Sequence, residues 1–407
     1  MHPWLRQWIV LAPAERLDDV EQLRAAFNAN VRNGCNGLIC KIKIWLFNAF
    51  WPFVLLVQAV PLSIGALGAR VSRQSGRSQL MQFSDQIQLG LQFYIDPVHY
   101  YMYRMYEKDN KVRANSFLLH DQMWNIFKVI NSGAEASFVT DKSGFNEFCD
   151  ANNLRHIPVI ARITKDVLEF SGLEVRHLPA EDMFAKPARG SNSGRGVLIV
   201  RYKSGCYMLD GDIEKYNEKN ICQLIKRYGK RNRDYILQPL YKSASAIHDL
   251  TGGVLSSFRV LTIRRPGDAV TTEWVVFKIP GQNAIADNFG AGGMAAPVDL
   301  KTGKIGSAIS LDYNDFPHAF HPETGVQIQG REIPFWREAI ELAEQAHRCV
   351  NIPLIGWDVG ICEDGPVLIE GNHEPAIEIL QISHCKGIGG TELGRFMADE
   401  VKRKGLI

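Results

Sequence analysis

The chain lacks the features that mark several broad classes of protein. Its 407 residues include 46 Lys and Arg against 44 Asp and Glu, which leaves a formal net charge of only +2. This balance gives no sign of the strongly basic field of a nucleic-acid-binding protein, and no acidic tail is present. Internal repeats and low-complexity tracts are also missing. A chain of this length and ordinary composition is expected to form two or three domains with a substantial core.

The eight cysteines include no C-x-x-C pair, and no triad-like string of catalytic residues is present. A chain of this size does not need disulfides to hold a small core together. We therefore expect reduced thiols, as in a cytoplasmic protein, and no cysteine-based metal site or nucleophile.

One long stretch without any charged residue covers residues 44–69. Its length meets the roughly 20 residues that a membrane-spanning helix needs. Two tryptophans and the Lys and Arg residues on both sides would suit the interface between lipid and water. The polar Asn48 and Gln58 disfavour a span, and Pro52 and Pro61 would kink or break a helix. Three interpretations stay open: a membrane anchor, an in-plane or re-entrant segment, and a buried helical hairpin.

The chain after residue 138 alternates strand and helix patterns, whereas the part before it is mainly helical. Apolar residues at helical spacing predict helices, and short β-branched or aromatic runs predict strands. The predicted helices cover residues 14–31, 142–151, 217–228 and 333–350, and the predicted strands cover residues 157–163, 234–241, 257–264 and 273–279. This alternation predicts an α/β (α+β) fold.

Residues 184–200, FAKPARGSNSGRGVLIV, place a lysine before a Gly/Ser/Arg loop and an apolar run after it. In a P-loop or a dinucleotide fold, the glycines would open a helix. Here both flanking segments have strand character, so we predict the tip of a β-hairpin. Gly194 and Gly196 can adopt positive φ and expose backbone N–H groups to an anion, beside the positive charge of Lys186. The loop is either a mobile surface turn or a lid that closes over a nucleotide triphosphate.

Residues 356–372, GWDVGICEDGPVLIEGN, form a second candidate region, in which two apolar runs flank the turn sequence E-D-G-P. A three-residue turn centred on Asp364 would place Asp358 opposite Glu370, with Asn372 on the same face as Glu370. Adjacent carboxylates in an apolar sheet are costly unless a cation compensates them. Oxygen ligands of this kind suit Mg²⁺, although a hairpin with solvent-facing acids has the same pattern.

The lysine–glycine hairpin, a strand that could bind adenine, and the acid hairpin follow one another in an order that resembles the ATP-grasp superfamily. The detailed string is most similar to the sugar-transfer-associated branch, which is related to α-L-glutamate ligases. The resemblance covers the chain from about Tyr94 onwards. It implies an ATP-grasp fold, in which two α/β subdomains clasp ATP, after a helical and apolar N-terminal region.

The resemblance implies which residues bind the nucleotide. Lys142 and Lys186 would contact its phosphates, and the glycine loop would be the lid. The hinge would hold adenine through backbone groups and a polar side chain, although many members of the superfamily have an acid where this chain has Gln238. The implied ATP-binding residues are Lys142, Lys186, Gly190, Ser191, Gly194, Gly196, Gln238 and Leu240.

The same resemblance implies the residues of the reaction centre. Arg259 would face the transferring phosphoryl group, and Lys278 stands where the family often has arginine. Asn288, in the string DNFGAGG, would line the acceptor site. Each of these could also be an ordinary turn or surface residue, but their joint order favours the functional interpretation. The implied ligands of Mg²⁺ or Mn²⁺ are Asp358, Glu370 and Asn372.

The resemblance divides the chain into four regions. A helical and apolar region, with candidate membrane contact at 44–69, covers residues 1–86, and a further helical region covers residues 87–135. The lid subdomain would cover residues 136–240, and the subdomain with the metal and acceptor sites would cover residues 241–407.

The implied activity is the ATP-dependent ligation of a carboxylate with an amine through an acylphosphate, which leaves an amide and ADP. The association of the family with cell-surface polysaccharide synthesis indicates sugar- or lipid-linked substrates, in the cytoplasm or at the inner face of the membrane. No nucleic-acid partner is expected. Two alternatives stay open: a phosphotransferase (kinase) on the same fold, and a membrane-associated ATP-binding scaffold without turnover.

Overall fold

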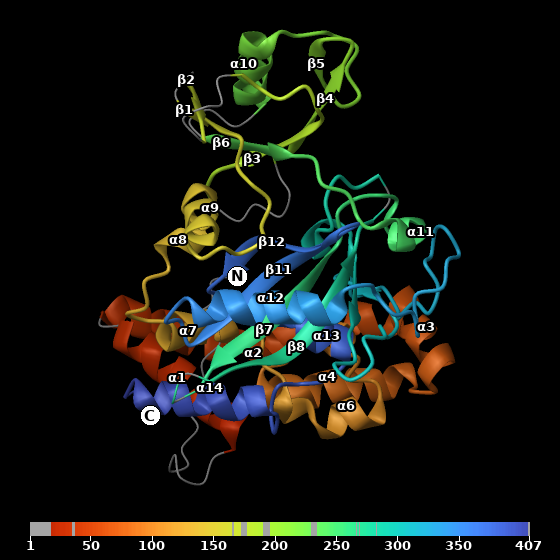
Figure 1. Cartoon of the computed structure of the whole chain (residues 1–407). Helices are drawn as coiled ribbons and strands as arrows, with labels where there is room; N and C mark the ends of the chain where they lie inside the picture. Colours follow the sequence, from red (N-terminus) through yellow and green to blue (C-terminus); the bar gives the residue numbers. More distant parts are fainter. Residues whose placement is uncertain are drawn as a thin grey trace. The chain divides into compact units, whose positions relative to one another are not determined.

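The structure is a computed structural model that describes residues 18–405, except 35–36, 165–166, 172–176, 190–195, 229–233, 266, 268 and 282. The chain divides into two compact units, and Figure 1 labels most of their helices and strands. The helical unit combines Met1–Ser132, Ile309–Pro317 and Glu374–Ile407. The sheet unit combines Gly133–Ala308 and His318–His373.

The helical unit brings helices from early and late parts of the sequence together. Helix α1 packs against α7 and α14, and its Leu23 and Phe27 are fully buried. Gln381 of α13 donates its amide N–H to the Leu118 carbonyl at 2.8 Å and accepts from the Leu118 N–H at 3.1 Å. The late helices therefore complete the core that α1 begins. The elements of this unit are α1 (Asp19–Gly34), α2 (Leu38–Ile64), α3 (Ala66–Ser75), α4 (Gln79–Phe93), α5 (Pro97–Met102), α6 (Lys108–Val112), η3 (Ala114–Ser116), α7 (His120–Ile130), β10 (Ile309–Ser310), α13 (Ile377–His384) and α14 (Glu392–Arg403).

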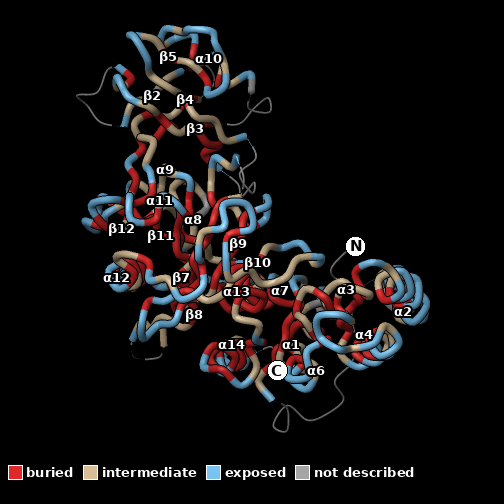
Figure 2. The backbone as a smooth tube through the Cα atoms, turned by 90° about the vertical axis from the view of Figure 1, so that its right-hand side faces the viewer, coloured by how far each residue is buried: buried red, intermediate tan, exposed pale blue. Residues whose placement is uncertain are grey.

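Helix α2 is one continuous helix of 27 residues, although it contains Pro52 and Pro61. Both prolines lie on its exposed side, so their rings do not disturb the side that packs. Most of the helix is exposed, as Figure 2 shows, and the alternative of a buried helical hairpin is therefore wrong. Among the described residues, α2 is the one helix that is long and apolar enough to cross a membrane.

The cysteines depart from expectation at one position. Six described cysteines are free, and Cys149, Cys222 and Cys362 among them are buried. Cys40, near the start of α2, is disulfide-bonded. The expectation of reduced thiols is therefore wrong at Cys40.

The first sheet of the sheet unit is antiparallel and carries the lysine–glycine hairpin. Strand β3 pairs with β4 through Ala185 and Leu198, and with β6 through Lys186 and Ile236, so Lys186 lies on a strand held from both sides. The predicted hairpin is thus confirmed. Helix α10 (Glu218–Tyr228) contributes Ile221 to the buried cluster on this sheet. In spatial order the strands are β2 (Val167–Phe170), β1 (Ala161–Thr164), β6 (Tyr235–Pro239), β3 (Met183–Pro187), β4 (Leu198–Lys203) and β5 (Cys206–Leu209).

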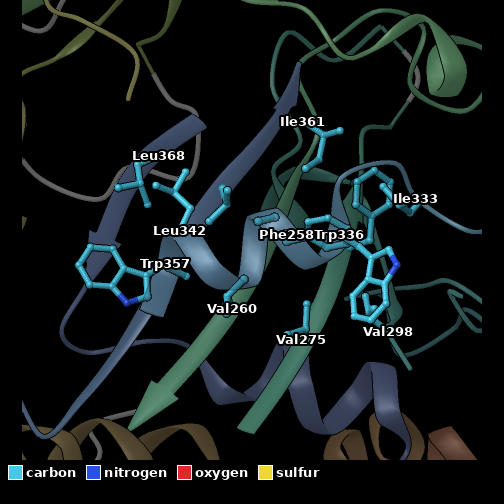
Figure 3. Packing of buried hydrophobic residues seen from close by; sticks show 14 of the residues in the cluster. Phe258, Val260, Val275, Val298, Ile333, Trp336, Leu342, Trp357, Ile361 and Leu368 are labelled. Atoms are coloured by element: carbon cyan, nitrogen blue, oxygen red, sulfur yellow. The ribbon is translucent and has the colours of Figure 1, made fainter. Parts of the chain in front are cut away.

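The second sheet of this unit is also antiparallel and carries the acid hairpin. Helix α12 (Trp336–Arg348) packs on one face of it, where Trp336 and Leu342 join Val260 and Trp357 in one buried cluster (Figure 3). The indole N–H of Trp357 donates to Thr262 Oγ1 at 3.0 Å, so its polar atom is satisfied within the core. In spatial order, the strands of this sheet that belong to the sheet unit are β9 (Met294–Pro297), β8 (Val270–Ile279), β7 (Ser257–Arg264), β11 (Leu354–Cys362) and β12 (Gly365–Asn372).

Short helices complete the sheet unit. Helices α8 and α9 contact β12, and Asp141 caps α9 by accepting the Ser143 N–H at 2.9 Å. The α/β (α+β) fold class and the predicted strand at 257–264 are confirmed, whereas β8 begins at Val270, before the predicted start at residue 273. The short elements are α8 (Ser137–Thr140), α9 (Lys142–Ala151), η4 (Ser245–Ile247), α11 (His248–Thr251) and η5 (Phe289–Ala291).

Candidate active site

The second sheet has one apolar face and one charged face. Successive side chains of a strand point to opposite faces. Phe258, Phe277 and Trp357 belong to the core under α12, so the residues that follow them in their strands lie on the opposite face. Those residues are Arg259, Lys278 and Asp358.

Strand pairing places three charged residues in one row across this face. Asp358 of β11 is paired with Arg259 of β7 on one side and with Glu370 of β12 on the other. The position of Asp358 opposite Glu370 is therefore confirmed. A carboxylate pair and an arginine thus converge on one side of a sheet whose other side is apolar.

The turn that produces this register differs from the predicted one. Cys362 pairs directly with Gly365, so the turn has two residues rather than three. Val359 pairs with Leu368, and a β-bulge shifts the register between Asp358 and Val359. The turn is one residue shorter than predicted, and the bulge inserts one extra residue into β12. The two changes offset each other, so Asp358 still pairs with Glu370.

Asp358 is 4% exposed and accepts hydrogen bonds from two cationic side chains. Arg259 donates from Nε to Oδ1 at 2.5 Å and from Nη2 to Oδ2 at 3.1 Å, and Lys278 Nζ lies 3.1 Å from Oδ2. Burial opposes ionisation of this carboxyl group, but the charges of Arg259 and Lys278 outweigh burial and lower its pKa to about 2. Asp358 is therefore a carboxylate at any neutral pH.

Asp287 is a second buried carboxylate of the same cluster. It accepts the backbone N–H and the hydroxyl of Ser257 on Oδ2, at 2.7 Å and 2.6 Å. Its other oxygen lies 3.3 Å from Lys278 Nζ, so Lys278 bridges Asp287 and Asp358. Burial raises the pKa of Asp287, with a further rise from Asp358 that Lys278 opposes. The ammonium group of Lys278 is held in place by two carboxylates from different elements.

The carboxylates of this cluster lie close enough to Lys186 to affect the pKa of its ammonium group. The side chain is buried, with 8% of the residue exposed. Burial lowers the pKa of Lys186 to about 8; the Glu370 and Asp358 carboxylates oppose this shift, and the Lys142 ammonium adds to it. The structure therefore brings together two lysines of the candidate phosphate site and two carboxylates of the candidate metal site.

A second ion pair holds the start of the glycine loop. Arg189 Nε donates to Asp141 Oδ2 at 2.8 Å, and the Lys142 N–H donates to the Ala188 carbonyl at 3.0 Å. Asp141 also caps α9, as described above, so one carboxylate fixes both the helix that carries Lys142 and the end of β3. The Asp141–Arg189 ion pair and the bond from Lys142 to Ala188 thus hold Lys142 next to the strand that carries Lys186.

Only the end of the glycine loop lies within the described residues. Gly196 has φ of +81°, and a Cβ at this position would lie 3.1 Å from Tyr235 Oη. Both facts explain why a residue without a side chain occupies this position. The other loop residues assigned to the nucleotide, Gly190, Ser191 and Gly194, lie outside the described residues.

We expect Gly196→Ala to impair turnover more than stability. The positive φ and the close Tyr235 hydroxyl should cost about 1–2 kcal/mol of unfolding free energy. Displacement of the loop next to the phosphates should lower kcat by about tenfold to a hundredfold. Gly205→Ala is a matched control, because Gly205 has φ of +77° and open space around it in the β4–β5 turn. An equal loss of kcat in both variants, measured as ADP release, would contradict a specific role for this loop.

The hinge residues are held by contacts within the protein. Gln238 is buried and donates from Nε2 to the Ile157 carbonyl at 2.8 Å. The Leu240 N–H donates to the Asp182 carbonyl at 3.0 Å. These bonds order the segment after β6, and the binding of adenine at Gln238 and Leu240 stays a prediction.

Asn288 has a structural contact of its own, and its neighbour Asp287 is the residue of the buried cluster. The Asn288 side chain accepts the Gly290 N–H at 2.9 Å at the start of η5. Asn288 was predicted to be catalytic and Asp287 only to line the acceptor loop beside it, whereas Asp141 was given no role in the site. A signal was available in each case, because both acids precede a residue that was selected, in the pairs Asp287-Asn288 and Asp141-Lys142.

The donor set opposite Arg259 suits a divalent cation by its chemistry. In the part of the chain that the structure describes, no group of three or more His, Cys, Asp and Glu side chains could hold a metal ion. The candidate ligands are instead two carboxylates, Asp358 and Glu370, and the amide of Asn372, whose nitrogen lies 3.5 Å from Glu370 Oε1. Oxygen donors of this kind fit Mg²⁺ or Mn²⁺, which complete their shells with water and phosphate oxygens.

The features described so far are those of the ATP-grasp class of protein. They are two antiparallel sheets, a buried strand lysine before a glycine loop, and paired acids on the second sheet. The sequence profile of the family described as sugar-transfer associated ATP-grasp matches residues 123–394, which is more than half of the chain. The chain therefore belongs to the sugar-transfer associated ATP-grasp family. The predicted ATP-grasp fold is confirmed.

Similar solved structures are distant. One is an L-amino acid ligase from Bacillus licheniformis, with 12% identity over 61% of this chain and 43% of that chain, at a TM-score of 0.33. Another is D-alanyl-alanine synthetase A from Vibrio cholerae O1 biovar eltor str. N16961, with 12% identity over 65% of this chain and 64% of that chain, at a TM-score of 0.37. The chain thus spans less than two thirds of either protein. No curated protein matches the chain in sequence.

Proposed function

We propose that the chain is an ATP-dependent carboxylate–amine ligase that forms an amide through an acylphosphate. One observation carries the proposal: the buried Lys186 ammonium lies within electrostatic range of Lys142 and of the carboxylates Glu370 and Asp358. Two cations for nucleotide phosphates and two carboxylates for a metal are what a bound metal–nucleotide requires in one place. The membership of the ATP-grasp family supports the nucleotide as ATP.

In the proposed reaction, the chain supplies charge and position rather than a nucleophile. Lys142 and Lys186 bind the phosphates, the loop at 190–196 covers them, and Arg259 stabilises negative charge on the transferring phosphoryl oxygens. A substrate carboxylate oxygen attacks the γ-phosphorus, and the bond to the β-phosphate oxygen breaks to release ADP. The amine then attacks the acyl carbon, loses a proton, and displaces phosphate. Exclusion of water by the covering loop protects the acylphosphate from hydrolysis.

The metal and the remaining residues have defined places in this proposal. Mg²⁺ or Mn²⁺, held by Asp358, Glu370 and Asn372, would neutralise phosphate charge. The hinge at Gln238 and Leu240 would hold adenine. Lys278 and Asn288 would line the acceptor side, where Asp287 and Asp358 keep the Lys278 ammonium in position.

The family description and helix α2 support a role in sugar-conjugate synthesis. We propose a cytoplasmic enzyme that acts on a sugar- or lipid-linked acid or amine in the synthesis of cell-surface polysaccharide or a related conjugate, with no nucleic-acid partner. Membrane contact through residues 44–69 would bring the enzyme to a lipid-linked substrate. The sugar-transfer association of the family and the exposed apolar side chains of α2 support this placement.

The proposed function predicts that ADP and amide appear in equal amounts. Purified protein is incubated with ATP, Mg²⁺ and pairs from a panel of sugar acids, amino acids and amino sugars. ADP is followed by a coupled assay, and the product is identified by mass spectrometry. For the correct pair, omission of either the acid or the amine should abolish amide formation.

Two other results would replace the ligase assignment. A phosphorylated hydroxyl compound with no amide would identify a phosphotransferase. ATP binding without release of ADP, for every acid and amine in the panel, would identify a scaffold. The intact set of candidate metal ligands, Asp358, Glu370 and Asn372, favours the ligase or phosphotransferase over the scaffold, because a chain that had lost catalysis would not need them.

A further inference from the structure

Helix α2 is apolar on its outer face, whereas a surface helix normally presents polar residues to water. Its few uncharged polar residues lie on the side toward the protein, beside the buried Trp51 and Leu55. Its polar residues Asn48 and Gln58 are half-buried, and Ser63 is fully buried. From residue 45 onwards, the exposed positions of the helix are all apolar. The large side chains of this outer face are Trp45, Leu46, Phe50, Phe53, Leu56, Val57, Val60 and Ile64, which are between 41% and 68% exposed.

The inner side of α2 is bonded to the rest of the helical unit along its length. The Trp51 indole N–H donates to the Gly90 carbonyl of α4 at 2.8 Å. Farther along, Gln86 of α4 donates from Nε2 to Ser63 Oγ at 2.9 Å. Trp51 and Ser63 are separated by about 18 Å along the helix axis. One face of α2 therefore packs against α4, and only its outer face is available to contact another partner.

Buried charge lies on α4, the helix behind α2. Asp85 of α4 is 2% exposed and accepts hydrogen bonds from Arg77 at 2.7 Å and from Lys111 at 2.5 Å. If α2 crossed a bilayer in this packed state, α4 and its ion network would have to enter the hydrocarbon with it. Such charged groups are expensive within a membrane. The packing thus favours a helix that lies along a membrane surface over one that spans it.

The segments that flank α2 in the sequence carry charge of one sign. No Asp or Glu occurs between Glu21 and Asp85, and this stretch contains seven Lys or Arg residues, whereas the whole chain has a net charge of only +2. Lys41 and Lys43, near the start of α2, and Arg73, in the helix that follows it, are exposed. An apolar face bordered by cations matches the acyl boundary and the headgroups of an anionic lipid surface.

We propose that α2 lies in the plane of an anionic membrane surface and buries its outer apolar face among the lipids. The inference rests on the membrane contact in the proposed function and does not depend on the ligase reaction. It selects one of the three arrangements that the sequence leaves open. Trp45, which is 67% exposed, would sit at the headgroup level, where tryptophan is favoured.

Sedimentation of the full chain with vesicles tests this proposal. We expect binding to vesicles of phosphatidylcholine mixed with phosphatidylglycerol and much weaker binding to phosphatidylcholine alone. The triple variant Phe53→Glu/Val57→Glu/Val60→Glu should bind at least about tenfold more weakly, because three charges replace buried apolar contacts. Lys41→Gln and Lys43→Gln should each weaken binding by about fivefold. Ile213→Glu is the matched control, because Ile213 is 92% exposed in the sheet unit and should have no effect.

Three further measurements separate the other outcomes. An alkaline carbonate wash should release the protein from the vesicles; retention would indicate a span and overturn the in-plane arrangement. Sedimentation velocity without lipid should show a monomer for the wild type and for the triple variant. Failure of the wild type to bind vesicles would overturn the membrane proposal. A wild-type dimer that becomes monomeric in the triple variant would also overturn it. ADP formation with soluble substrates should be equal in all these variants, so a failed membrane experiment leaves the ligase proposal separately testable.

Discussion

Lys186→Ala is expected to lower kcat/KM for ATP by about a hundredfold to a thousandfold, the usual loss when one donor to a developing charge is removed from a buried site. Lys186 lies on β3, which is paired on both sides, and it is almost completely buried. Its ammonium group therefore has a fixed position and little water to screen it. ADP release at saturating Mg²⁺ measures the effect.

The control for this substitution is Lys203→Ala. Lys203 ends β4 in the same sheet and is exposed, so its loss should leave kcat/KM unchanged. A Lys186→Ala enzyme that retains full turnover would remove the central residue of the proposed ATP site. Circular dichroism and the thermal unfolding curve of both variants show whether the fold is kept.

The same lysine gives an expected pH dependence. Burial lowers the pKa of Lys186 to about 8, so the free enzyme loses this positive charge as the pH rises through that value. Since the protonated form is the one that attracts phosphate, kcat/KM for ATP should fall above this pH. In Lys186→Arg, whose guanidinium stays charged, the fall should disappear from whatever activity remains.

Asp358→Ala is expected to lower the free energy of unfolding by about 3–5 kcal/mol, because it leaves buried cations without their partner. The side chain accepts hydrogen bonds from Arg259 and Lys278, and all three are packed on the face opposite α12. Lys278 keeps Asp287 as a partner, so most of the loss should come from the unpaired Arg259. Urea unfolding followed by tryptophan fluorescence measures it.

Two comparisons make this second prediction specific. Asp364→Ala removes an exposed carboxylate that pairs with Arg155, and its effect should be too small to separate from experimental error. Arg259→Met in the Asp358→Ala background should recover part of the lost stability, because it removes the uncompensated charge. If the double variant were less stable than Asp358→Ala, the loss would come from packing rather than from the buried ion pair.

The sequence predicts much of the charged face because alternation along strands is a local property. Once β7 and β11 are identified, the positions of Arg259 and Asp358 opposite the apolar core follow from the period of two. The register of the acid hairpin was also predicted correctly at Asp358, but for a reason that the structure changes. A two-residue turn and a bulge produce the same offset as a three-residue turn, and turn sequences do not reveal bulges.

Contacts between segments far apart in the sequence could not be predicted in this way. Asp287 reaches Ser257 and Lys278 from the loop after β8, and no periodic pattern relates a loop residue to a strand. The environment of α2 was equally inaccessible, since an apolar helix can pack inside a protein or remain exposed with the same sequence. Which side of α2 is covered is set by its packing on α4, where Gln86 bonds to Ser63, and this is a feature of tertiary structure.

The order of segments in the helical unit has a consequence for synthesis of the protein. Helix α1 emerges from the ribosome before α14, so the core that these two helices share and the Gln381 bonds to Leu118 cannot form until the later segments are made. The strands of the sheet unit can pair before then, since they lie between these two parts of the chain. During translation the apolar side of α1 therefore stays uncovered while the sheet unit is made, and such exposure favours aggregation or chaperone binding in that interval.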